Sequence, residues 1–211
     1  MSTGESLNNS IETTDPDARL MLQVRDDVQG AFEVLVEKYQ NRLLGILAHL
    51  VGSVEEAEDL TQEVFLRIYR ARKGYKPRAK FSTWLFTIAN NLAMNHLRNK
   101  GRHPTSNLGG ESTGMMRNRP SPAAQLPAPE GTPSTQLRQA ELSEIVRDAL
   151  ETLGEDQKIA VLLSKFEEMS YAEIAEIMGR SEAAVKSLLA RARMHLREHL
   201  EPYLRAGTKA G

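Results

Sequence analysis

The residues whose types and spacing indicate the clearest chemistry lie between positions 170 and 193. Ser170 and Glu173 have the spacing of a capping box, in which each side chain accepts a hydrogen bond from a backbone amide at a helix start. Gly179 stands where the chain needs a positive φ to turn, and Ser181 can cap the next helix. The pattern predicts a helix-turn-helix whose second helix enters the major groove of DNA.

This second helix is predicted to have one buried and one exposed side. Val185, Leu188 and Leu189 have the helical spacing of inward-facing residues. The residues left to point outward are mostly basic: Lys186, Ser187, Arg191 and Arg193. An ordinary helical hairpin with a solvated basic face is the alternative, but the agreement of caps, turn glycine and basic helix favours DNA binding.

The composition excludes several other kinds of chemistry. The chain has 211 residues, a net charge of −1 and no cysteine, so disulfides, thiolate catalysis and cysteine-ligated zinc are ruled out. Glycine-rich phosphate loops and nucleophile elbows are missing from the sequence, and the five histidines are scattered. His195 and His199 share a helical face but have no further ligands in the pattern. We therefore expect no enzyme activity, no catalytic residue, no cofactor and no metal.

The sequence also carries no membrane signal. Its first 17 residues are polar without an apolar run, and no stretch approaches the roughly 20 apolar residues that a membrane span needs. We expect a cytoplasmic protein without a signal peptide and without membrane insertion of its own.

Helical periodicity predicts the elements that position these residues. A first short helix opens at Asp15-Pro16, and a second helix ends at Gly52. Ser53 and Glu56 form a further capping box that begins a third helix, which runs to about residue 73. After a loop at 74–80, a fourth helix follows at about 82–99.

The stretch 101–136 is rich in proline, glycine, serine and threonine, which is linker composition. Helical periodicity returns after it. We predict an all-α protein: two small helical domains joined by a flexible Pro/Gly-rich linker, the second with the helix-turn-helix. The predicted parts are a disordered tail at 1–14, a domain at 15–103, the linker at 104–136 and a domain at 137–205.

Charge is sorted along the first domain. Residues 26–63 hold nine acidic and two basic side chains, whereas residues 64–103 hold ten basic and no acidic ones. A basic block attracts phosphate and releases counterions from nucleic acid. The acidic block repels DNA, which favours a protein as its partner. The alternative is a pair of solvated helix faces.

Three segments, in this order, resemble an extracytoplasmic-function sigma factor of bacterial RNA polymerase. They are Asp59-Leu-Thr-Gln-Glu-Val-Phe-Leu-Arg-Ile-Tyr-Arg70, Phe81-Ser-Thr-Trp-Leu-Phe-Thr-Ile-Ala-Asn-Asn91, and Ser170 to Met178 with Val185-Lys-Ser187 and Arg191-Ala-Arg193. The resemblance covers about 20–103 and 137–203. It implies a promoter-melting domain (sigma region 2) and a helix-turn-helix domain (sigma region 4) that reads an upstream element.

The resemblance also implies partners and contact residues. Asp59, Gln62 and Glu63, which share one helix face, would bind the clamp helices of the largest polymerase subunit; the alternative is that these acids complement the positive start of their helix. An anti-sigma factor is a further expected partner. The melted minus-10 element would meet Lys76, Arg78, Lys80, Asn90, Asn91, Asn95 and Arg98. Double-stranded minus-35 DNA would meet Lys186, Ser187, Ala190 and Arg191, with Arg193 and Arg197 on phosphates.

The chain departs from the family pattern in its minus-10 loop. Family members often have Phe-Arg-Gly-Asp/Glu-x-x-Phe, where this chain has Tyr75-Lys-Pro-Arg-Ala-Lys-Phe81. Thr87 and Leu188 stand where arginine is common. We interpret Trp84 and Phe81 as core residues, with stacking on a base as the alternative for Trp84.

Promoter-specific initiation on core polymerase is therefore the predicted function. One alternative is a dimeric helix-turn-helix repressor or activator that acts without polymerase, and it leaves the basic block unexplained. The other alternative is a helical adaptor that binds only protein, and it leaves the basic helix unexplained.

Overall fold

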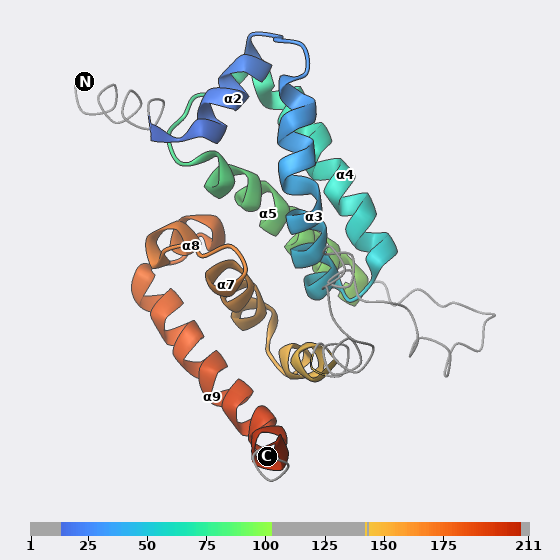
Figure 1. Ribbon diagram of the computed structural model, residues 1–211, viewed down its shortest axis with the longest axis vertical. Helices are drawn as coiled ribbons and strands as arrows, with labels where there is room; N and C mark the ends of the chain where they lie inside the picture. Colours follow the sequence, from blue (N-terminus) through green and yellow to red (C-terminus); the bar gives the residue numbers. More distant parts are fainter. Residues whose placement is uncertain (1–13, 103–141, 143, 208–211) are drawn as a thin grey trace, which may run out of the picture.

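The computed structural model describes residues 14–102, 142 and 144–207, and every regular element among them is helical (Figure 1). In chain order the elements are α2 (Pro16–Arg25), α3 (Ala31–Val51), α4 (Val54–Ala71), the short 3-10 helix η1 (Arg72–Gly74), α5 (Phe81–Arg102), α7 (Glu155–Lys165), α8 (Tyr171–Met178) and α9 (Glu182–Gly207). Residues 144–151 are helical as well. The predicted all-α fold class is confirmed.

The predicted tail and linker fall on residues that the structure does not describe. Thr14 apart, the tail at 1–14 and the whole linker at 104–136 lie outside the described residues. Both remain predictions from composition.

The N-terminal helices begin and end where the sequence predicts. Asp15 is the N-cap of α2 and accepts a hydrogen bond from the Asp17 backbone N–H at 3.0 Å, with proline at the first helical position. Gly52 ends α3 with a left-handed φ of 77°. Ser53 Oγ accepts from the Glu56 N–H at 3.3 Å and so caps α4.

The predicted capping box at Ser53 is only half made. The Glu56 carboxylate accepts hydrogen bonds from Lys100 Nζ at 2.8 Å and contacts His96 Nε2 at 3.0 Å. A cationic ammonium is a stronger partner for a carboxylate than a neutral backbone amide. The pairing of Glu56 with α5 therefore replaces its expected return to Ser53.

Helices α3, α4 and α5 enclose the core of the first unit. α3 and α4 run side by side and α5 crosses beneath them (Figure 1). The largest buried side chains come from all three helices and from α2: Met21, Leu35, Tyr39, Leu43, Leu47, Ile68, Phe81, Leu85 and Phe86. Phe81 is fully buried, as predicted.

Helices α7, α8 and α9 form the second unit, and α8 with α9 is the predicted helix-turn-helix. Both halves of the capping box between Ser170 and Glu173 are made. Gly179 ends α8 with a left-handed φ of 61°, and Ser181 Oγ accepts from the Ala184 N–H at 3.2 Å to start α9. The local sequence signals at this turn are therefore confirmed one by one.

The two units also pack on each other, because α5 lies against α8 and α3 against α7. The Asn90 side-chain amide donates to the Ile177 carbonyl oxygen at 3.3 Å in a buried contact. Two ion pairs surround it, between Lys80 and Glu173 at 2.8 Å and between Arg42 and Glu167. In this structure the helix-turn-helix therefore rests on the first domain.

Gly179→Ala should destabilise the protein by about 1 kcal/mol, because the left-handed region is strained for any residue with a Cβ. No heavy atom lies within 4 Å of the added Cβ, so the effect is one of backbone strain alone. Urea unfolding followed by far-UV circular dichroism measures it.

Gly45→Ala is the matched control. It also has no heavy atom within 4 Å of the added Cβ, but it lies inside α3 and its φ is not positive. Its stability should rise by about 0.5–1 kcal/mol, because alanine favours the helix over glycine. Equal stability of the two variants would contradict the role of Gly179 in the turn.

Candidate promoter-binding and polymerase-binding surfaces

The basic side of α9 is open to solvent. Val185, Leu189 and Ala192 are buried against the rest of the helix-turn-helix, and Leu188 is half-buried. All six residues expected to contact minus-35 DNA are exposed: Lys186, Ser187, Ala190, Arg191, Arg193 and Arg197.

These six residues form one continuous strip along the helix. Lys186, Ala190, Arg193 and Arg197 follow each other at i, i+4, i+7 and i+11, which places them on one face. Ser187 and Arg191 form the adjoining row, and the Arg191 Nε donates to the Ser187 carbonyl at 3.4 Å. Ala190 places a small side chain between the cations of the strip.

Tyr171 contacts two cations of this strip and was not predicted from the sequence. Its hydroxyl accepts a hydrogen bond from Arg193 Nη2 at 3.3 Å, and Lys186 Nζ lies 6.0 Å from its ring centroid. Tyr171 is the first residue of α8, 22 positions before Arg193. No local spacing links residues that far apart, although an aromatic residue at the start of the first helix was a visible signal.

A pocket of about 620 Å³ opens beside the loop between η1 and α5. It is lined by Ala71, Gly74, Tyr75, Lys76, Arg78, Ala79, Trp84, Thr87 and Glu176. The ring centroids of Tyr75 and Trp84 lie 5.0 Å apart. Lys76 and Arg78 are exposed at the edge of the pocket. The pocket combines aromatic surface with cations, which is what binding of single-stranded nucleic acid requires.

Tyr75 and Trp84 both serve as more than core residues. Tyr75 is 5% exposed, and its hydroxyl has no hydrogen-bond partner among the described residues. Burial raises the pKa of this hydroxyl. Trp84 packs partly buried against the Tyr75 and Phe81 rings while also lining the pocket. Trp84 is therefore partly a core residue, as predicted, and partly a wall of the pocket.

The structure divides the remaining predicted minus-10 residues into two groups. Asn91, Asn95 and Arg98 lie on one exposed face of α5, where Arg98 Nη2 donates to Asn95 Oδ1 at 2.7 Å. Asn90 lies on a different side of α5, 7% exposed and turned toward α8, and its Oδ1 has no partner among the described residues. Lys80 is exposed but bound to Glu173, and this hydrogen bond raises the pKa of Lys80.

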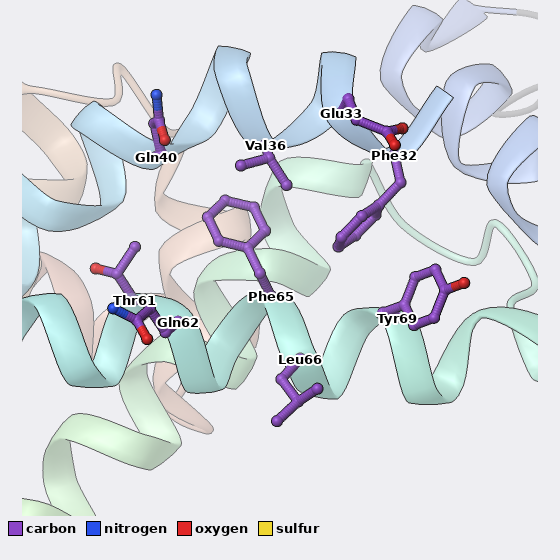
Figure 2. A pocket seen from close by; sticks show the side chains of 9 residues that line it. All are labelled: Phe32, Glu33, Val36, Gln40, Thr61, Gln62, Phe65, Leu66 and Tyr69. Atoms are coloured by element: carbon purple, nitrogen blue, oxygen red, sulfur yellow. The ribbon is translucent and has the colours of Figure 1, made fainter. Parts of the chain in front are cut away.

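One of the expected polymerase-binding residues, Gln62, lines an apolar groove between α3 and α4 (Figure 2). Asp59 and Glu63 lie near it in sequence on α4, at the helical spacing of a shared face. Asp59 and Gln62 are exposed, while Glu63 is half-buried and paired with Arg67 at 2.7 Å. The groove measures about 570 Å³ and is lined by Phe32, Glu33, Val36, Gln40, Thr61, Gln62, Phe65, Leu66 and Tyr69.

Apolar side chains stay accessible in this groove. Leu66 and Tyr69 are each 42% exposed, and the rings of Phe32 and Tyr69 lie 5.0 Å apart. Phe32, Val36, Leu66 and Tyr69 were not predicted as binding residues from the sequence. Gln62, Leu66 and Tyr69 recur at i, i+4 and i+7, and this spacing was the available signal.

Neither a metal site nor a membrane span is found in the described parts of the chain. Within residues 14–102 and 144–207, no three histidine, aspartate or glutamate side chains gather in a way that would hold a metal ion. None of the described helices is long and apolar enough to cross a membrane.

The comparisons with known proteins identify the family. Residues 35–103 match the family model Sigma-70 region 2, and residues 143–196 match Sigma-70, region 4. The RNA polymerase sigma-H factor of Pseudomonas aeruginosa is 34% identical over 92% of this chain and 98% of its own length. The ECF RNA polymerase sigma-E factor of Escherichia coli K12 is 32% identical over 90% of this chain and 96% of its own.

This chain belongs to the extracytoplasmic-function sigma factors. Solved structures agree on the fold of the sigma factor: CnrH, bound to the cytosolic domain of CnrY, aligns with a TM-score of 0.63 and 22% identity over 89% of this chain and 99% of that one. The sigma factor RpoE of Bartonella quintana, bound to the anti-sigma factor NepR, aligns with a TM-score of 0.61 and 25% identity over 81% and 96% of the two chains.

Membership of the family establishes the general function. The protein binds core RNA polymerase and directs promoter-specific transcription initiation, and it is a specificity subunit rather than an enzyme. A dimeric repressor that acts without polymerase is not favoured by any of these relatives.

Arg191→Ala should weaken binding of minus-35 duplex by about 1–3 kcal/mol and relax the preference at one base pair, because arginine paired with guanine is the commonest specific contact. Arg197→Ala should weaken binding by a similar factor for every sequence, since a phosphate contact carries no base information. Titration of holoenzyme with single-base promoter variants measures both, and a loss of preference in the Arg197 variant would contradict the assignment.

Proposed function

We propose that this sigma factor sits on core polymerase through the α3–α4 groove and the acidic face beside it. The observation that carries this proposal is the open apolar groove with Leu66 and Tyr69 exposed next to Asp59, Gln62 and Glu63. An apolar centre with a charged rim is the usual anatomy of a protein interface. The clamp helices of the largest polymerase subunit, expected from the family resemblance, are suited to this surface if they present basic and apolar residues together.

The pocket beside Tyr75 and Trp84 is proposed to receive an unstacked base of the minus-10 element. Its aromatic surface supports stacking, and Lys76 and Arg78 lie where the DNA backbone would pass. Asn91, Asn95 and Arg98 extend the same binding surface along α5. Melting is then driven by binding of the single strand and needs no nucleotide hydrolysis.

The minus-10 surface requires α8 to move away from α5. Glu176 of α8 forms one wall of the pocket, and α8 also holds Lys80 and Asn90. We propose that these contacts separate when the protein engages polymerase and promoter. The α9 strip is exposed already and is proposed to bind the minus-35 major groove without rearrangement.

The proposed domains are 15–103 for polymerase binding and minus-10 recognition and 137–205 for minus-35 recognition. The protein is proposed to work in the cytoplasm, where polymerase and chromosome are found. An anti-sigma factor is a proposed partner, since solved relatives of this fold were crystallised with one.

Transcription from reconstituted holoenzyme tests the proposal. Purified chain and core polymerase should together give run-off transcripts from promoters selected out of a random library, and neither component alone should do so. Binding of a palindrome as a dimer, with no dependence on polymerase, would overturn the proposal in favour of a repressor.

Leu66→Glu should lower the affinity for core polymerase at least about tenfold, because a charge placed in the groove must lose its water when the partner binds. The 42% exposure of Leu66 means that folding is little affected. Fluorescence titration of labelled protein with core polymerase measures the change.

Met194→Glu is the control for the same substitution outside the groove. Met194 is 60% exposed on α9, and its replacement should leave the affinity for core within about twofold, as expected for surface positions away from an interface. Parent-like binding by the Leu66 variant would exclude the groove as the polymerase surface.

A further inference from the structure

Helix α2 holds the two ends of the minus-10 loop, although it lies before the segment that matches Sigma-70 region 2. The loop leaves η1 at Tyr75 and enters α5 at Phe81. Its path depends on where these two ends are fixed. The chain makes one attachment at each end, and both come from α2 and the residues that flank it.

The first attachment holds the start of the loop. Lys73 Nζ donates to the Arg25 carbonyl oxygen at 2.8 Å and forms an ion pair with Asp27. Arg72 Nε also lies 3.4 Å from Asp27 Oδ1. These contacts tie η1 to the C-terminal end of α2, and the Tyr75 N–H continues the turn by donating to the Arg72 carbonyl at 3.1 Å.

The second attachment holds the end of the loop and comes from Asp15. The Phe81 N–H, the first of α5, donates to Asp15 Oδ2 at 2.8 Å, across 66 positions of sequence. Lys80 precedes the helix, and its ammonium carries only donors, so it cannot cap α5 itself. A carboxylate at this end also complements the positive end of the helix.

One carboxylate therefore begins two helices. Asp15 Oδ1 accepts from the Asp17 N–H at the start of α2, while Oδ2 accepts from Phe81 at the start of α5. α2 is itself fixed on α3, because the Asp17 carboxylate accepts from Tyr39 Oη at 2.6 Å and from Lys38 Nζ at 2.5 Å. A ten-residue helix of about 15 Å thus spans the loop and anchors it at both ends.

The position of Phe81 is passed on to the pocket through ring contacts. Its ring centroid lies 6.1 Å from that of Trp84, and Trp84 lies 5.0 Å from Tyr75. Trp84 and Tyr75 both line the pocket. Burial raises the pKa of the Tyr75 hydroxyl, and the negative charges of Asp15 and Asp17 raise it further.

From these contacts we infer that Asp15 is a positioning residue for minus-10 recognition: by capping α2 and α5 together it sets the geometry of the loop and pocket that hold the melted strand. The inference rests on the proposed role of that pocket. Asp15 itself touches no DNA in this scheme, and its effect passes through Phe81 and Trp84.

Asp15→Ser separates the two caps. Serine is a good N-cap for its own helix, so α2 keeps its start, but serine has one side-chain oxygen and the bond to Phe81 is lost. In holoenzyme, the affinity for a single-stranded minus-10 oligonucleotide should fall about tenfold, as expected for loss of a charge-assisted hydrogen bond. The affinities for core polymerase and for minus-35 duplex should stay within about twofold of the parent.

Ser53→Ala is the matched control for stability. It removes the cap at the N-terminal end of α4, the end opposite to η1 and the loop, and so should lower the melting temperature without changing oligonucleotide affinity. If Asp15→Ser does not fold, Asp15→Asn takes its place, since its single acceptor oxygen can serve only one of the two amides; it should lose part of the same affinity.

Two results would overturn the inference. One is a parent-like oligonucleotide affinity in folded Asp15 variants. The other is an equal loss for core, duplex and single strand, which indicates general destabilisation. Failure of the parent holoenzyme to bind the oligonucleotide would instead remove the proposed function of the pocket, and the two failures are thereby told apart.

Discussion

The packing of α5 on both helical units is the contact on which the rest of the structure depends. One side of α5 fills the core against α3 and α4 with Phe81, Leu85 and Phe86, while Asn90 on another side meets α8. The bond of its Nδ2 to the Ile177 carbonyl favours the closed arrangement, in which the two units pack together, while its Oδ1, buried without a partner among the described residues, weakens that arrangement. A third side, with Asn91 and Asn95, is exposed and is the side proposed to bind DNA. The same helix thus takes part in the core, in the contact between the units and in the proposed promoter-binding surface.

The contacts between the two helical units stabilise the closed arrangement only moderately. The ion pair of Lys80 with Glu173 joins partly exposed side chains, and such a pair contributes about 1 kcal/mol or less. Arg42 pairs with Glu167, whose side chain is 2% exposed, and the cost of burying that carboxylate offsets much of the attraction. Polymerase and promoter together offer far larger surfaces to the same protein. An arrangement in which the described polar contacts between the units are few is suited to opening when the protein binds its partners.

Local features of this fold could be predicted from sequence because their causes are local. The caps at Asp15, Ser170 and Ser181 and the turn at Gly179 each depend on residues within four positions, and the outward strip of α9 follows from helical periodicity. The α3–α4 groove could not be predicted in the same way, because periodicity identifies the apolar face of each helix but not the distance between two packed helices. The contact of Asn90 with α8 joins residues 87 positions apart, and the bond of Phe81 to Asp15 joins residues 66 positions apart. No spacing rule reaches that far.

The central claim is that the α3–α4 groove and its acidic face seat the protein on polymerase. Hydrogen–deuterium exchange of the sigma factor, alone and saturated with core polymerase, tests this claim most directly. Backbone amides of residues 59–69 should exchange more slowly in the complex, because the groove and the acidic face become covered. Backbone amides of residues 186–197, whose side chains are proposed to bind DNA, should exchange as fast as in the free protein. Unchanged exchange at 59–69 in a saturated complex would contradict the claim that this surface seats the protein on polymerase.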